Sequence, residues 1–149
     1  MISTLAMRNK LLVVLLLPFS LFAQGDSHDI AFEWIEAQLK GIRVDFARPP
    51  IHARNLYHVS LGMYDAWAAY DEVAEPLLLG HTLGGYTAEF DGVPDFVLPF
   101  LDIPTARKEA ISYAAYRILT HRYALSPGVV TSQARFDSLF TANGYDPSL

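Results

Sequence analysis

The sequence predicts an all-α protein, a partial helical bundle with one long connection rich in Gly and Pro. Three observations predict this fold class. Apolar side chains recur at steps of three and four residues in four separate stretches, which is the spacing of one helix face. Proline stands near the start of three of these stretches, where the first N–H groups of a helix have no intrahelical partner. Alternation of apolar and polar residues, which would indicate strands, is weak and confined to the connection.

The first helix is expected over residues 29–43. Its apolar residues lie three or four apart with charged residues between them; they are Ile30, Trp34, Ile35, Leu39 and Ile42. This spacing is typical of an amphipathic helix with one side toward a core. Arg48-Pro49-Pro50 interrupts the pattern, so a second helix is expected to begin near Pro50 and to continue to Tyr70 or Glu72.

The second helix is apolar on most of its sides. Placed at steps of about 100°, its apolar residues form two neighbouring faces, Leu56, Val59, Met63, Trp67 and Tyr70 on one, and Tyr57, Leu61, Tyr64 and Ala68 on the next. A narrow strip remains, made up of Asn55, His58, Gly62, Asp65 and Ala69, with Arg54 at its edge. We expect such a helix to be surrounded inside a bundle, with Gly62 and Ala69 allowing close approach of a neighbour.

Residues 75–101 have a different character, because they hold four glycines and three prolines. Helix is therefore not expected in this connection. Residues 86–90 alternate weakly before Asp91-Gly92, which is a hairpin turn signal. The sequence thus allows a small β-hairpin on the connection, and an irregular loop is the alternative.

Two further helices are expected after the connection. The third runs from residue 104 or 105 to about residue 124 and is again apolar on most sides. Ser126 is expected as the N-cap and Pro127 as the N1 proline that opens the fourth helix. The body of this helix is expected over roughly residues 128–143. Gly144 is then suited to the left-handed position after the helix. The side chains expected to face inward from the fourth helix are Phe136, Leu139 and Phe140.

Residues 1–23 predict a signal peptide. Arg8 and Lys10 precede an aliphatic run over residues 11–17, and small residues follow up to Ala23, the expected cleavage site. A membrane-spanning helix is the competing interpretation, but such a helix needs about 20 apolar residues. The apolar stretch here ends at Ala23 and is interrupted by proline. We therefore expect residues 24–149 to be exported to the periplasm or the medium, with no stable membrane anchor after cleavage.

Composition and charge exclude several classes of function. The chain has 16 Asp+Glu against 11 Lys+Arg, a formal net charge of −5 at pH 7, and removal of residues 1–23 would leave nine basic residues and −7. An acidic chain without a basic cluster is not expected to bind nucleic acid or anionic lipid. The absence of cysteine excludes disulfides, thiolate metal sites and a cysteine nucleophile. At 52% hydrophobic and 18% charged residues, the chain is expected to need a partner that covers apolar surface.

The residues present do not assemble a predicted active site. His52 and His58 are six apart and so point to opposite sides of a helix, whereas His58 and Asp65 are seven apart on one face, which is a weak metal-ligand signal. We favour a polar strip satisfied by hydrogen bonds between helices. Asp65 and Asp71 lie on different faces, so they do not pair, and Asp71 and Glu72 are expected at the solvated end of the helix. Neither a Gly-x-Ser-x-Gly elbow nor a phosphate-binding loop occurs.

Several segments of the sequence resemble those of a known protein family. They are Arg48-Pro49-Pro50-Ile51-His52-Ala53-Arg54, Met63-Tyr64-Asp65-Ala66-Trp67-Ala68-Ala69-Tyr70-Asp71 and Ala114-Ala115-Tyr116-Arg117-Ile118-Leu119, together with Trp34. They resemble the amino-terminal helical region of bacterial vanadium-dependent haloperoxidase-like proteins, relatives of the type 2 phosphatidic acid phosphatases. The resemblance extends over most of residues 24–149 and concerns the scaffold of that family. It implies an all-α bundle of the acid phosphatase/haloperoxidase type.

The resemblance also implies an anion pocket for vanadate, or for phosphate in the phosphatase branch. In that family the pocket is built from Lys-x6-Arg-Pro, Pro-Ser-Gly-His and a Ser-Arg pair followed by His, whose cations and imidazoles hold the oxyanion. This sequence has neither Pro-Ser-Gly-His nor Ser-Arg, and seven residues instead of six separate Lys40 from Arg48-Pro49. We therefore expect Lys40 and Arg48 to be surface and helix-start residues. No catalytic, cofactor-binding or metal-binding residue is assigned, and vanadate is expected only for a longer protein.

Two interpretations from different classes remain. The favoured one makes residues 24–149 the amino-terminal scaffold of an exported haloperoxidase-like enzyme, truncated at 149, whose carboxy-terminal catalytic part is the expected partner. The alternative is a self-contained exported helical module that binds a partner without catalysis, and a scaffold that has lost its pocket is a third. The apolar helices and the helix-start signal Asp146-Pro147-Ser148 favour the first. It predicts that residues 24–149 alone are poorly packed or self-associate.

Overall fold

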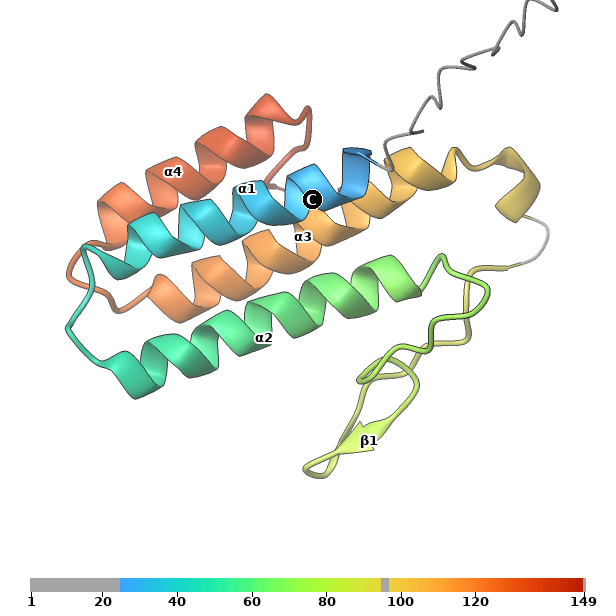
Figure 1. The fold of residues 1–149 in the computed structure, drawn as a ribbon, viewed down its shortest axis with the longest axis horizontal. Coiled ribbons are helices and arrows are strands. Elements are labelled where there is room, and N and C mark those ends of the chain that lie inside the picture. The colour runs from blue at the N-terminus through green and yellow to red at the C-terminus, as the bar shows by residue number, and fades with distance from the viewer. Residues whose placement is uncertain (1–24, 95–96, 149) are drawn as a thin grey trace, which may run out of the picture.

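The computed structural model describes residues 25–94 and 97–148 and confirms an all-α fold. Its helices are α1 (Gly25–Ile42), α2 (Pro49–Ala68), α3 (Ile103–Tyr123) and α4 (Val129–Ala142), with a short 3-10 helix at Leu98–Phe100. α1 and α3 each pack against the other three helices, and α3 makes the more extensive contacts. α2 and α4 lie on opposite sides of the pair formed by α1 and α3 (Figure 1). The predicted signal peptide lies outside the described residues.

The start of α4 differs from the prediction. The helix begins at Val129 with Gly128 as its N-cap, whereas Ser126 and Pro127 form a turn before it. The Ser126 hydroxyl accepts a hydrogen bond from the Gly128 amide at 3.2 Å, which is a local turn contact and not a helix cap. Glycine is required here because a Cβ at Gly128 would lie 2.6 Å from the carbonyl oxygen of Val44. Contact with the α1–α2 turn therefore decides where α4 begins.

The end of α4 confirms the role predicted for Gly144. Its φ of +83° is the left-handed conformation, and its amide donates to the carbonyl of Thr141 at 2.9 Å. The amide of Tyr145 donates to the carbonyl of Phe140 at 3.2 Å, and the two rings lie 5.4 Å apart. This is a Schellman motif with its accompanying apolar contact. The motif turns the chain back onto the α3–α4 surface.

The small hairpin exists, but the turn predicted for it is wrong. β1 (Thr82–Leu83) pairs antiparallel with β2 (Tyr86–Thr87), so the turn is Gly84-Gly85 and not Asp91-Gly92. Both turn glycines have positive φ, +59° and +85°, which is the conformation that a two-residue hairpin turn needs. The hairpin projects from the end of α2 (Figure 1), and all of its residues are exposed.

The core is closed and largely aromatic. Trp34 is fully buried where α1 meets α3 and α4, and its indole N–H donates to the Ser112 hydroxyl at 3.2 Å. The ring centroids of Tyr116 and Phe140 lie 6.3 Å and 6.2 Å from that of Trp34. The other buried apolar residues of the core are Ile30, Ala37, Val59, Met63, Ile111, Ala115, Leu119, Tyr123 and Phe136. Phe136 and Phe140 are thus buried as predicted, and Leu139 is half-buried against them.

α2 is covered on one side only, which differs from the expectation that it is surrounded. Val59 and Met63 enter the core, and a Cβ on Gly62 would meet the Ile118 side chain at 2.5 Å, so the predicted close approach at Gly62 is confirmed. On the outer side, Tyr57 is 62% exposed and Tyr64 is 38% exposed. One side of α2 is therefore exposed, whereas the interior of the described residues is closed and not poorly packed.

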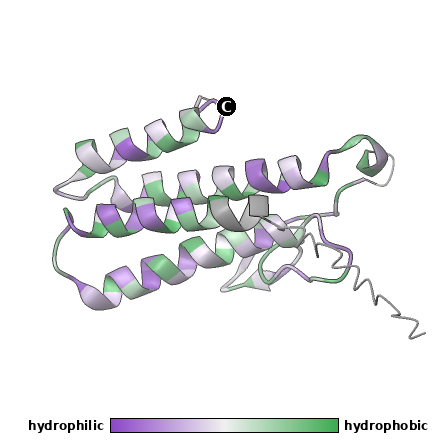
Figure 2. Cartoon of the chain, turned by 45° about the horizontal axis from the view of Figure 1, so that its top comes forward, coloured by the Kyte–Doolittle hydropathy of each residue, from purple (hydrophilic) through white to green (hydrophobic). Residues whose placement is uncertain are grey.

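Hydrophobic and hydrophilic residues are mixed along every helix (Figure 2). Among the described helices, none combines the length and the apolar character needed to cross a membrane.

Replacement of Gly144 tests the helix end. Gly144→Ala is expected to lower the free energy of unfolding by about 1–2 kcal/mol, because a Cβ is unfavourable in the left-handed conformation. Chemical denaturation followed by circular dichroism measures this change. Gly144→Asn, which tolerates that conformation better, is expected to lose less, and equal stability of the alanine variant and the parent would contradict the assignment.

Candidate functional site

Asp65 anchors the long connection to the end of α2. Its side chain is buried, with the residue 3% exposed, and its carboxylate accepts three backbone hydrogen bonds. The donors are the amides of Leu77 at 2.8 Å, Leu78 at 2.7 Å and Leu79 at 3.0 Å. Three N–H groups satisfy a buried carboxylate without a cation. Asp65 is therefore a structural anchor, and its oxygens are already occupied.

Arg107 joins the start of α3 to the end of α2. Its guanidinium donates to the carbonyl of Tyr70 at 2.8 Å and to the carboxylate of Asp71 at 2.7 Å, and it lies 4.9 Å from the ring centroid of Trp67. Asp71 also accepts from two backbone amides beyond the helix, and these bonds, together with Arg107, hold the pKa of Asp71 below its usual value. Asp71 was expected at the solvated end of the helix. It is instead paired with Arg107.

Three nitrogen-bearing side chains gather where α2 passes α3. We call this group, Arg54, His58 and Arg122, the α2–α3 notch. The guanidinium of Arg122 donates to Nδ1 of His58 at 2.8 Å, so the neutral imidazole carries its proton on Nε2. Partial burial, followed by the charges of Arg122 and Arg54, holds the pKa of His58 below its usual value of 6.5. The notch thus carries its positive charge on the two arginines.

A second polar cluster connects α3 to α4 and is satisfied within itself. The Tyr116 hydroxyl donates to the Asp137 carboxylate at 2.7 Å, and the Gln133 amide donates to Asp137 at 2.7 Å. The same Gln133 amide also reaches the hydroxyls of Tyr116 and Thr120, each at 3.2 Å. Burial and the neighbouring carboxylate raise the pKa of Tyr116. We interpret this cluster as a clamp between helices, because its members bond to one another.

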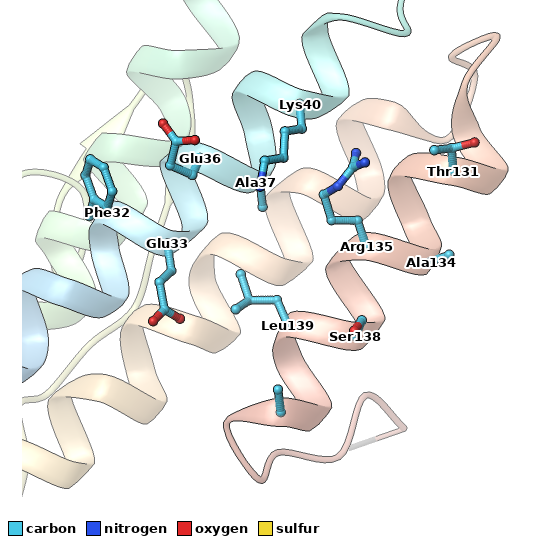
Figure 3. A pocket seen from close by; sticks show the side chains of 11 residues that line it. Phe32, Glu33, Glu36, Ala37, Lys40, Thr131, Ala134, Arg135, Ser138 and Leu139 are labelled. Atoms are coloured by element: carbon cyan, nitrogen blue, oxygen red, sulfur yellow. The ribbon is translucent and has the colours of Figure 1, made fainter.

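An open groove of about 650 Å³ runs between α1 and α4 (Figure 3). Ala37 and Leu139 contribute apolar side chains to it, while Lys40 and Arg135 contribute positive charge. The remaining lining residues are Phe32, Glu33, Glu36, Thr131, Ala134, Ser138 and Ala142. The groove contains both charge signs but no histidine among its described lining residues, and none of its hydroxyl side chains is hydrogen-bonded to a base.

The residues considered as metal ligands in the sequence, His52, His58 and Asp65, do not form a metal site. Asp65 bonds to the connection, whereas His58 bonds to Arg122, so the two side chains have separate partners. His52 bonds through Nε2 to the carbonyl of Phe46 at 2.7 Å and orders the turn before α2. Across residues 25–94 and 97–148, no group of three or more His, Cys, Asp or Glu could hold a metal ion. His58 and Asp65 of the strip have hydrogen-bond partners, although Asp65 bonds to the connection and not to a helix, whereas the buried Oδ1 of Asn55 has none among the described residues.

The two residues of the rejected Lys…Arg-Pro motif lie where we expected them. Lys40 is exposed on α1, and Arg48 is the N-cap residue of α2. The Arg48 guanidinium lies 4.7 Å from the ring centroid of Phe46. These two basic residues therefore do not converge on a common pocket.

Sequence reasoning missed the partners of Asp65, Arg107 and Arg122. These partners lie 12 to 64 residues away, so no local spacing indicates them. The signal available for Asp65 was its position in the last turn of a mostly apolar helix, because a carboxylate buried there requires donors from the chain that follows.

No protein-family model, curated protein or solved structure matches the chain. The geometry of its own residues therefore carries the functional argument. Within the described residues, that geometry provides anchors, a notch and a groove.

The Asp65 anchor can be tested with an isosteric change. Asp65→Asn is expected to lower the free energy of unfolding by about 1–3 kcal/mol, because the amide offers one acceptor oxygen to three buried N–H groups. Hydrogen exchange at the amides of residues 77–79 should accelerate, as measured by mass spectrometry or NMR. Asp91→Asn, at an exposed position of the same connection, is the control. Unchanged exchange at 77–79 in Asp65→Asn would show that the anchor has no role.

Removal of one arginine tests the electrostatics of the notch. Arg122→Gln is expected to raise the pKa of His58 toward 6.5, because it removes a positive charge that disfavours the imidazolium. An NMR titration of the imidazole C–H signals measures this pKa. Arg43→Gln, at an exposed position in the α1–α2 turn, removes the same charge elsewhere and should leave the value unchanged. A fall in the pKa of His58 in Arg122→Gln would contradict the assignment.

Proposed function

We propose that the chain is a non-catalytic scaffold, the amino-terminal helical part of an exported haloperoxidase-like enzyme whose catalytic part lies elsewhere in the polypeptide. One observation carries this proposal. α2 has the composition of a surrounded helix, yet on its outer side Tyr57 is 62% exposed and Tyr64, whose hydroxyl donates to the carbonyl of Glu75 at 3.1 Å, is 38% exposed. Exposed aromatic residues on an otherwise buried type of helix are typical of a surface that another protein segment covers.

The residues present do not fit a vanadate centre. The α2–α3 notch alone among the described clusters combines arginine with histidine, but the Nδ1 of His58 accepts from Arg122 and its Nε2 carries the proton. Neither ring nitrogen is therefore available as a metal ligand. Arg54 and Arg122 are exposed, so the notch also lacks the enclosure that strengthens an oxyanion site. We derive no reaction step for these residues.

A self-contained exported binding module is the second candidate, and the closed core favours it. Trp34, Phe136 and Phe140 are all fully buried, so the four helices have a common interior of their own. In both candidates, the outer side of α2 is the surface that contacts a partner. They differ in whether that partner belongs to the same polypeptide.

The gene and the surface of α2 together test the scaffold proposal. We expect the reading frame to continue past the codon for Leu149 and to encode Lys-x6-Arg-Pro, Pro-Ser-Gly-His and Ser-Arg with a later His. In the longer protein, Tyr57 and Tyr64 should be protected from hydroxyl-radical oxidation, because the following segment covers them. In residues 24–149 alone, both should be oxidised, and neither bromide oxidation nor phosphate-ester cleavage should occur with added vanadate.

Tyr86 provides an internal control, because it belongs to the hairpin that follows α2 and is 86% exposed. It should be oxidised equally in both proteins. A stop codon after Leu149, with an intact mass that matches residues 24–149, would overturn the scaffold proposal and leave the binding module. Turnover by residues 24–149 would overturn both.

A further inference from the structure

The α2–α3 notch holds two arginines that the described part of the chain leaves without an acidic partner. Within this part, Arg107 forms an ion pair with Asp71 and His52 lies 4.0 Å from Asp45, but neither Arg54 nor Arg122 has a carboxylate partner. Arg122 bonds instead to a neutral imidazole. What distinguishes this group, in a chain with an excess of acidic residues, is that the charges of both arginines act on the same imidazole.

The notch adjoins the exposed aromatic side of α2. Tyr57 neighbours His58 with its ring centroid 5.9 Å from that of the imidazole, and Tyr64 lies two helical turns further along the same helix. The notch and the outer side of α2 therefore form one continuous surface. Tyrosine and arginine are enriched among the residues that contribute most to protein interfaces.

The positive charge of Arg54 and Arg122 favours an anionic group as the ligand of the notch. Guanidinium groups bind planar carboxylates through paired, charge-assisted hydrogen bonds. A bound anion would also offset the mutual repulsion of the two guanidinium groups. The imidazole Nε2–H of His58 adds a further donor if it faces the same anion. An acidic side chain among apolar residues would match both parts of the surface.

We propose that the α2–α3 notch binds the carboxylate of a Glu or Asp side chain in the protein segment that covers the outer side of α2. The inference rests on the proposed function, since it names the chemistry of the covering segment. Arg54 and Arg122 hold the carboxylate, while Tyr57 and Tyr64 pack against its apolar neighbours. The notch thereby sets the register of the segment along α2.

A pair of matched peptides tests the proposal on residues 24–149. The first is a 20-residue amphipathic helix made of Leu, Ala and Glu, and the second has Gln at every Glu position. Amide signals of Arg54, Tyr57, His58 and Arg122 are followed by NMR during each titration. The Glu peptide is expected to bind at least about tenfold more tightly than the Gln peptide, which corresponds to about 1.4 kcal/mol.

Charge-removing variants identify the site. Arg54→Gln and Arg122→Gln should each reduce the preference for the Glu peptide to about threefold or less. Both positions are exposed, so the fold should persist, as dispersed amide signals would show. Arg43→Gln removes the same charge at another exposed position and should leave the tenfold preference intact.

Three results would overturn the inference. They are equal affinity for the two peptides, no binding of the Glu peptide, and inorganic phosphate that shifts the same signals at a lower concentration than the Glu peptide does. The last would assign the notch to free oxyanions. Protection of Tyr57 and Tyr64 in the longer protein decides the scaffold proposal separately, so that proposal can stand where the carboxylate assignment fails.

Discussion

The burial of Trp34 is the constraint on which the arrangement of the helices depends. Its indole is a large ring with one polar atom, so a buried position must supply both apolar neighbours and a hydrogen-bond acceptor. Ser112 on α3 supplies the acceptor, and the rings of Tyr116 and Phe140 supply the neighbours. This requirement fixes how α1 meets α3 and α4. α2 then packs against the other side of α3 and keeps one side open.

The polar groups of the molecule fall into two kinds. Asp65, Asp71 and Arg107 are occupied by contacts that hold the long connection and the start of α3 to the end of α2. Arg122 joins α3 to α2 only through the His58 imidazole, neither it nor Arg54 has a carboxylate partner among the described residues, and both lie beside the uncovered side of the same helix. This difference indicates that the two sides of α2 make different kinds of contact. One side organises this chain, and the other is suited to contact with a further segment.

Helix positions could be predicted from the sequence because they depend on local spacing and on proline, and each predicted helix lies within a few residues of an observed one. One error arose where a distant contact outweighs a local signal, because Val44 places the start of α4 at Val129. The other was a choice between two local signals, because the pair Gly84-Gly85 provides the hairpin turn that Asp91-Gly92 was expected to provide. No site residue was predicted, and the notch was missed because Arg122 lies 64 residues from His58. Pairing across that distance depends on how α3 packs on α2.

The placement of the two tryptophans has a spectroscopic consequence. Trp34 is enclosed by aromatic rings, whereas Trp67 is partly open to solvent beneath the Arg107 guanidinium. Intrinsic fluorescence therefore contains one component that water-soluble quenchers such as acrylamide do not reach and one that they do. The first component reports on the meeting of α1, α3 and α4, and the second on the junction of α2 with the long connection. A difference between their denaturation midpoints would mean that this junction opens before the interior does.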